Sequence, residues 1–198
     1  MEVLRLYNGL PKARQLRQVA SALTDGELAI IPTDTNYSAV CSLNSKKGIN
    51  RLYALNSGKS EKKITLFCAD LKDISLYATV SNPAYRMMKS LVPGPYTFIL
   101  PASRLVPKMV LTKRRTVGIR TPDQPLCQEL PRELGTALLG LSVKNAAGSE
   151  NMIAGLENSF RGRVAYLFDA GDIISESSTI LDFTGDECVV LRRGKGPI

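Results

Sequence analysis

Short apolar runs of strand length alternate with amphipathic helical segments along the chain, and this alternation restricts the fold more than any other feature. Residues 11–25 carry apolar side chains at helical spacing, namely Leu16, Val19, Ala20 and Leu23. Gly26 ends this segment, and the apolar run at residues 28–31 follows as a buried strand. Strands interleaved with helices predict an α/β fold, and strand pairs joined by short turns predict mixed pairing within the sheet.

The same periodicity predicts the other elements. Further helices are expected at residues 46–56, 82–91 and 126–134, with Asn82 as the cap and Pro83 in the first turn of the second. Strands are expected at residues 27–31, 37–41, 64–68, 97–100, 117–120, 137–143, 164–168, 179–183 and 189–192. A chain of 198 residues suffices for one sizeable core, and no linker divides it, so we expect a single domain over residues 1–198.

Composition excludes several classes of protein. Hydrophobic residues make up 44% and charged residues 22%, as in ordinary globular proteins. No apolar run approaches the roughly 20 residues that span a bilayer, and the N-terminus lacks the apolar segment of a signal peptide. We therefore expect a cytoplasmic protein without a membrane partner.

The chain has no histidine, which excludes Ser-His-Asp and Cys-His catalysis and imidazole acid–base chemistry. Its four cysteines are widely spaced and form no Cys-x-x-Cys pair. They are expected to be buried thiols in a reducing compartment, and no protein-bound metal site is expected.

Residues 32–35 read Pro-Thr-Asp-Thr and leave the buried strand directly. Proline fixes its own φ, and Thr and Asp side chains bond either the nearby backbone or a ligand. The loop therefore has two interpretations, local capping and a binding site, and taken alone it favours capping.

Four further motifs follow in order: Val-Pro-Gly-Pro-Tyr-Thr at 92–97, Val-Gly-Ile-Arg-Thr-Pro at 117–122, Ser-Thr-Ile-Leu-Asp at 178–182 and Leu-Arg-Arg-Gly at 191–194. This series resembles the YrdC-like family, whose domain makes threonylcarbamoyl-adenylate for transfer-RNA modification. The resemblance covers about residues 10–194, and the segments 113–120 and 148–150 look closest to the YciO branch. It implies a single-domain YrdC-like fold, in which helices flank a twisted mixed sheet with a basic concave surface.

The resemblance also implies roles for individual residues. Thr35, Arg120 and Ser178 match the threonine side of the family's site. The nucleotide side, which would take ATP with magnesium, is matched by Lys62, Thr116, Asn145 and Arg192. Without the resemblance, a salt bridge to a neighbouring acid explains Arg120 equally well, and the others are ordinary turn, strand-edge or solvated side chains.

Departures from the family pattern put catalysis in doubt. Synthases carry Lys-x-Arg where this chain has Asn-Ser-Gly at 56–58, and Ser-x-Asn where it has Val-Lys-Asn at 143–145. The missing cations would stabilise developing negative charge, and loss of one such group typically costs about a hundredfold or more in rate. Lys59 and Lys144 are candidates to replace them from displaced positions.

A net charge of +8 favours phosphate-bearing partners. The basic run consists of Lys108, Lys113, Arg114 and Arg115. It is either a solvated face or a nucleic-acid surface, and the lack of tryptophan and of nearby aromatic residues favours backbone contact with folded or double-stranded RNA over base stacking.

Three hypotheses follow. The favoured one is a YciO-like paralogue of the synthase that binds a nucleotide, a small acyl-nucleotide, or transfer RNA or double-stranded RNA. The second is an active threonylcarbamoyl-adenylate synthase, a nucleotidyltransferase. The third is a non-catalytic RNA-binding module.

Overall fold

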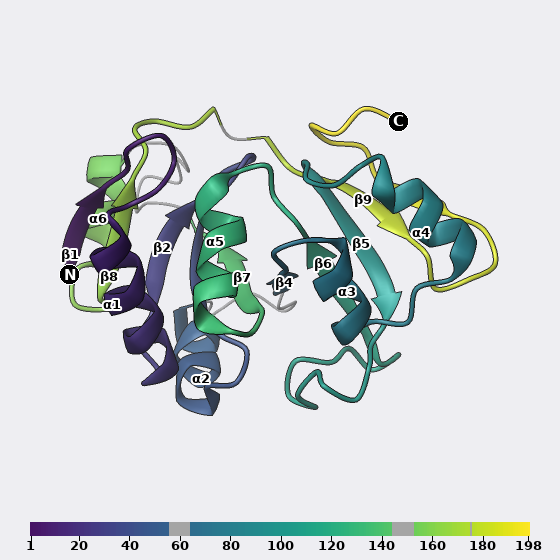
Figure 1. Cartoon of the computed structure of the whole chain (residues 1–198), viewed down its shortest axis with the longest axis horizontal. Helices are drawn as coiled ribbons and strands as arrows, with labels where there is room; N and C mark the ends of the chain where they lie inside the picture. The colour runs from purple at the N-terminus through teal and green to yellow at the C-terminus, as the bar shows by residue number, and fades with distance from the viewer. Residues whose placement is uncertain (56–63, 144–152, 175) are drawn as a thin grey trace.

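The computed structural model describes residues 1–55, 64–143, 153–174 and 176–198 (Figure 1). The helices are α1 (Ala13–Thr24), α2 (Lys46–Leu55), α3 (Leu71–Tyr77), α4 (Asn82–Lys89), α5 (Pro125–Leu134) and α6 (Ile153–Phe160). The strands are β1 (Glu2–Arg5), β2 (Ala29–Pro32), β3 (Tyr37–Ser42), β4 (Thr65–Phe67), β5 (Tyr96–Pro101), β6 (Thr116–Arg120), β7 (Leu138–Ser142), β8 (Tyr166–Asp169), β9 (Thr179–Asp182) and β10 (Val189–Arg192).

Within the described residues, ten strands form one sheet in the order β1-β8-β2-β3-β7-β4-β6-β5-β9-β10. Parallel pairs such as β4–β6 and β5–β9 alternate with antiparallel pairs such as β2–β3 and β5–β6. The predicted α/β fold with a mixed sheet is therefore confirmed. Every residue of β2 and β3 is buried, which explains why β2 reads as an apolar run and why β3 carries mostly apolar or small side chains.

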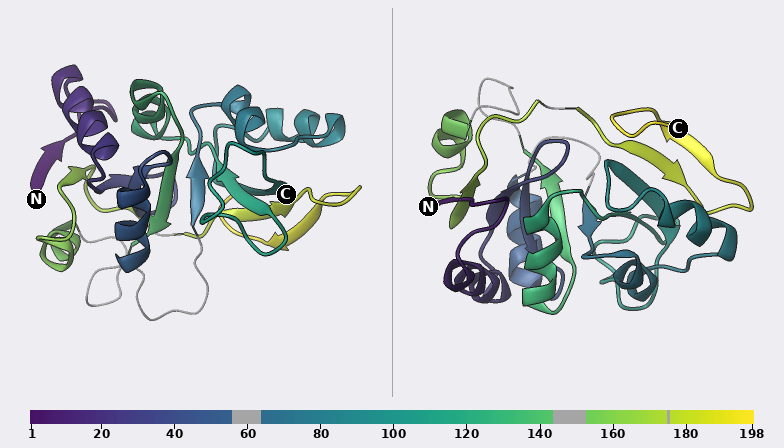
Figure 2. Two further views of the ribbon diagram at one scale, coloured as in Figure 1. Left: turned by 90° about the horizontal axis from the view of Figure 1, so that it is seen from below. Right: turned by 45° about the horizontal axis from the view of Figure 1, so that its top comes forward.

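Each face of the sheet has its own apolar core. On one face, Val19 and Leu23 of α1 and Leu130 of α5 join a cluster that includes Ile31. The opposite cluster includes Ile30 together with side chains of α2 and α6. Neighbouring residues of β2 thus point to opposite faces, as the period of a strand requires. Figure 2 shows α1 and α5 on one side of the sheet and α2 and α6 on the other.

The structure contains three elements that the periodicity did not predict: β1, α3 and α6. Strand β1 buries only Leu4 and pairs with β8, a partner far away in the sequence. Helix α3 has only seven residues, too few for a clear helical repeat. The cap of α4 is also corrected, because the side chain of Ser81, not Asn82, accepts the backbone N–H of Ala84.

The cysteine prediction holds for three of the four residues. Cys41, Cys68 and Cys127 are buried free thiols, and burial raises the pKa of Cys41 to about 12. Cys188 is only partly buried, because it precedes the exposed outer strand β10. No helix in the described part of the chain is long and apolar enough to cross a membrane.

Gly140 in β7 is required by close packing. A Cβ atom there would lie 2.6 Å from the ring of Phe67, which is buried. We expect Gly140→Ala to lower the free energy of unfolding by about 1–3 kcal/mol in urea denaturation, because the ring has to move within a packed core. Gly185→Ala is the matched control, since its Cβ would meet nothing within 4 Å. Equal stability of the two variants would contradict this assignment.

Candidate functional site

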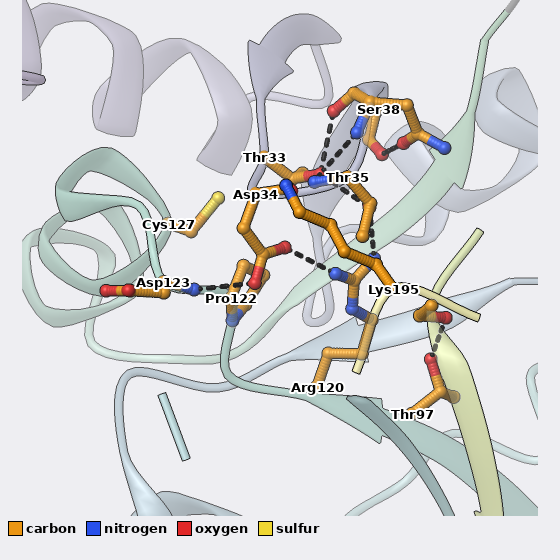
Figure 3. A network of polar contacts seen from close by, with 12 residues as sticks. Thr33, Asp34, Thr35, Ser38, Thr97, Arg120, Pro122, Asp123, Cys127 and Lys195 are labelled. Atoms are coloured by element: carbon orange, nitrogen blue, oxygen red, sulfur yellow. Dashed lines mark hydrogen bonds and ion pairs between the residues drawn. The ribbon is translucent and has the colours of Figure 1, made fainter. Parts of the chain in front are cut away.

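The turn between β2 and β3 is held by Thr33. Its hydroxyl accepts the backbone N–H groups of Thr35 and Asn36, each at 3.1 Å, and donates to the carbonyl of Asn36 at 2.7 Å. The Thr35 hydroxyl lies 3.0 Å from that of Thr33 and is also buried (Figure 3). Local capping is therefore present, and the Thr33 hydroxyl performs it, with the Thr35 hydroxyl hydrogen-bonded to it.

Arg120 ends β6 and reaches this turn with two of its nitrogens. Nη2 lies 2.5 Å from Oδ1 of Asp34, and Nη1 donates to the Thr35 hydroxyl at 3.0 Å. The other carboxylate oxygen of Asp34 accepts the backbone N–H of Asp123 at 2.9 Å. The side chains of Arg120 and Asp34 are only 5% and 8% exposed, so this is a buried ion pair. The salt bridge that competed with a ligand role for Arg120 is present in the structure.

The ion pair with Asp34 leaves one nitrogen of the Arg120 guanidinium group, Nε, without a partner among the described residues. This nitrogen is buried. Burial lowers the pKa of Arg120, the charge of Asp34 opposes that shift, and the nearby Arg192 lowers it further. A buried donor without an acceptor costs about 1–3 kcal/mol. A ligand oxygen at this position would remove that cost and offset the repulsion between the two guanidinium groups.

Ser178 joins the same site from the segment before β9. Its hydroxyl lies 2.8 Å from that of Thr97 and accepts from Nη2 of Arg192 at 3.1 Å. Nε of Arg192 donates to the carbonyl of Ser178 at 3.0 Å. Ser178 is buried, so two hydroxyl groups and a guanidinium group are fixed here in one arrangement.

Sheet topology explains why these residues meet. Strand β5 runs antiparallel to β6 and parallel to β9, so the end of β6 and the start of β9 lie on either side of the start of β5. The β2–β3 turn meets the end of β6 through the contacts of Arg120 with Asp34 and Thr35. The structure thus brings together Thr35, Arg120, Ser178 and Arg192, which lie far apart in the sequence.

Of the other predicted site residues, Thr116 and the basic run lie away from this cluster. Thr116 begins β6 and pairs with the Thr112 hydroxyl at 2.8 Å, about 13 Å from Arg120 at the usual rise per strand residue. Lys62 and Asn145 lie outside the described residues, as do Lys59 and Lys144. The basic run lies in the loop between β5 and β6, and its members are all exposed: Lys108, Lys113, Arg114 and Arg115.

Sequence patterns missed three contributors to the site. Thr97 lies within a recognised motif but had no assigned role, and Asp123 contributes its backbone N–H. Lys195 donates from Nζ to the carbonyl oxygen of Asp34 at 2.5 Å. No local pattern marks Lys195, since the contact joins residues 161 positions apart.

A cavity of about 310 Å³ adjoins the site without containing it. It lies between α4, α5 and the start of α3, and Thr121, Lys89 and Arg132 are in its wall. The cluster around Arg120 lies at the end of the interior strand β6, and Arg120 is not in the wall of this cavity. Among the described residues, no group of three or more Cys, Asp or Glu side chains could hold a metal ion.

The ion pair can be tested by a double-mutant cycle. We expect Arg120→Met to lower the free energy of unfolding by about 3 kcal/mol, because Asp34 would remain buried without its cation. The Asp34→Asn/Arg120→Met double variant should lose less than the sum of the two single losses, since it buries no unpaired charge. Urea denaturation at neutral pH measures all four proteins. Additive losses would show that the two side chains do not depend on each other.

Comparison with known proteins agrees with this architecture. Residues 21–194 match the model of the Sua5/YciO/YrdC family, described as telomere recombination. An uncharacterized protein of Haemophilus influenzae is 34% identical over 191 residues, which cover 94% of this chain and 92% of that protein. The uncharacterized protein YciO of Escherichia coli is 31% identical over 191 residues, which cover 95% and 93% of the two chains. A putative threonylcarbamoyl-AMP synthase of Methanocaldococcus jannaschii is 26% identical over 202 residues, which cover 100% of this chain and 95% of that protein.

Solved structures show the same relationship. The crystal structure of Escherichia coli YciO matches with a TM-score of 0.91 at 30% identity, covering 99% of this chain and 97% of that one. Pyrococcus abyssi Sua5 complexed with L-threonine matches with a TM-score of 0.84 over 97% of this chain and 56% of Sua5. At 22% identity, that second match establishes similarity of fold alone. The chain belongs to the Sua5/YciO/YrdC family.

Proposed function

We propose that the cluster of Thr35, Arg120, Ser178 and Arg192 binds a nucleotide or a small acyl-nucleotide. The chain is a YciO-like member of a family related to threonylcarbamoyl-AMP synthases. The observation that carries the proposal is the unpartnered Nε of Arg120 beside a second guanidinium group and two buried hydroxyl groups. Guanidinium and hydroxyl groups are the usual donors to carboxylate and phosphate oxygens.

The carboxylate of a threonine-like group fits the Arg120 side of the cluster. Nε would donate to a carboxylate oxygen, and the Thr35 and Ser178 hydroxyls would orient the remaining polar atoms. A related fold has been solved in complex with L-threonine, which supports this choice of ligand.

The nucleotide would occupy the Arg192 side, with magnesium arriving together with ATP. Its assigned contacts are Arg192, Thr116, Lys62 and Asn145. A nucleotide that reaches both Arg192 and Thr116 would have to extend along β6, because these residues lie towards opposite ends of that strand.

Turnover by the synthase route is the weaker hypothesis. The Lys-x-Arg cations that synthases carry are replaced at residues 56–58, and the Ser of their Ser-x-Asn motif is replaced by Val143. Loss of one preorganised group costs about a hundredfold or more in rate. Lys59 and Lys144 remain the candidates for replacement. An active synthase is distinguished by release of pyrophosphate that requires both threonine and bicarbonate.

RNA binding belongs to a different surface. Lys108, Lys113, Arg114 and Arg115 are exposed on one loop, and within the described residues none forms an ion pair with an acidic side chain. Such cations are free to contact phosphates of transfer RNA or a double-stranded RNA. A non-catalytic RNA-binding module would use this loop alone.

Small-ligand binding is tested by calorimetry with ATP and with threonylcarbamoyl-adenosine, each with magnesium. We expect Ser178→Ala and Arg120→Ala to weaken binding at least tenfold, because each removes a fixed donor or acceptor of the cluster. Ser75→Ala is the control, since Ser75 is exposed on α3 and bonds only its own helix. Unchanged affinity in folded Ser178→Ala protein would overturn the proposed site.

RNA binding is tested with a short RNA duplex at several salt concentrations. The double variant Lys113→Glu/Arg114→Glu should bind the duplex more weakly. The slope of the logarithm of the binding constant against the logarithm of salt concentration should fall in magnitude by about one for each phosphate that the loop no longer neutralises. Arg14→Glu/Arg17→Glu on α1 changes the same amount of charge at exposed positions far from the loop in sequence. An equal effect of the two double variants would mean that net charge, and not this loop, governs binding.

A further inference from the structure

The segment after β10 folds back over the start of β9 and is fixed there by hydrogen bonds. The backbone N–H of Lys195 donates to the carbonyl of Ser177 at 2.9 Å. The Thr179 hydroxyl accepts from the N–H of Gly194 at 3.0 Å and donates to the carbonyl of Gly196 at 2.6 Å. The backbone is therefore held by hydrogen bonds at Lys195 itself and at the residues directly before and after it.

Close packing of the two glycines fixes this segment further. A Cβ atom at Gly194 would overlap the carbonyl oxygen of Ser177. At Gly196 it would overlap the ring of Tyr96, whose hydroxyl donates to the carbonyl of Pro197 at 2.8 Å. The segment has one position against the sheet, and that position determines where the Lys195 side chain starts.

From there the Lys195 side chain reaches the candidate site. It passes in front of Arg120 towards Asp34 and Thr35 (Figure 3). Its Nζ donates to the carbonyl oxygen of Asp34, the residue whose carboxylate holds Arg120. Because Lys195 is exposed and its acceptor is an uncharged carbonyl, the ammonium group can turn to a stronger acceptor without breaking an ion pair.

Cations gather around this point of the structure. Three cations lie here, Arg120, Arg192 and Lys195, and the carboxylate of Asp34 pairs with Arg120. Two exposed acidic residues, Asp123 and Glu176, contact the same turn through their backbone N–H groups. Within the described residues, neither Arg192 nor Lys195 forms an ion pair with an acidic side chain. Arg192 and Lys195 are therefore the two cations available to a ligand, and a phosphate monoester with a charge of about −1.5 to −2 at neutral pH matches them.

We propose that Lys195 is a ligand-binding residue that selects for a phosphate group, contacting it together with Arg192. The assignment rests on the proposed function, because it places the phosphate of a nucleotide beside the threonine-side donors. A lysine ammonium binds phosphate as a point charge, so the contact needs no fixed fork geometry. A zwitterionic amino acid has one carboxylate, which the free Nε of Arg120 serves, and does not need Lys195.

Calorimetric titrations with adenosine monophosphate and with L-threonine test this assignment on wild type, Lys195→Ala and Arg193→Ala. Arg193 is the matched control, because it is an exposed cation two positions away in the same segment. Lys195→Ala should weaken binding of adenosine monophosphate about tenfold, the usual size of one charge-assisted contact. Arg193→Ala should change it less than twofold, and threonine affinity should stay within twofold in both variants.

Each other result overturns a defined statement. If wild type binds adenosine monophosphate and both variants lower that affinity equally, or neither lowers it, Lys195 makes no specific contact. The assignment then fails while the proposed function stands. If Lys195→Ala lowers the affinity for threonine as much as the affinity for adenosine monophosphate, the statement that Lys195 selects for phosphate fails. If wild type binds neither probe, the proposed function fails together with the inference. Unchanged thermal unfolding of Lys195→Ala shows that a loss of affinity is not a loss of fold.

Discussion

The buried ion pair between Arg120 and Asp34 is the contact on which the arrangement of the site depends. It joins the end of β6 to the β2–β3 turn, two segments 86 residues apart in the chain. Asp34 also receives the backbone N–H of Asp123 and, through its carbonyl, the ammonium group of Lys195. A buried pair of this kind contributes little net stability, because desolvation offsets the attraction, but it fixes which groups meet.

The same pair determines the electrostatics of the site. Asp34 neutralises Arg120 while leaving its Nε without a partner, and Arg192 lies close enough to lower the pKa of Arg120 further. The site therefore combines one compensated guanidinium group with two further cations. This arrangement of charges is the basis on which we propose a ligand with more than one negative charge.

Local patterns predicted most of the elements because those elements carry clear periodicity. Helix α1 and strands β2 and β3 differ from their predicted bounds by only a few residues, since apolar side chains repeat regularly in them. Elements without a regular repeat were missed, such as β1 with its single buried side chain and the short helix α3. The site motifs were recognised by resemblance, whereas Thr97 and Lys195 acquired a place in the site only through contacts distant in sequence.

The sequence by itself determined the α/β class and the absence of any imidazole chemistry, because composition and local spacing can be read directly from the chain. Its motifs carried the resemblance that identified the family. The sequence left open whether Arg120 pairs with an acid or faces a ligand. The tertiary structure decided that Arg120 does pair with Asp34 and still keeps one donor free. It also placed Thr116 at the far end of β6 and Lys195 beside Asp34. These outcomes depend on strand order and register, which bring together residues that no local pattern connects.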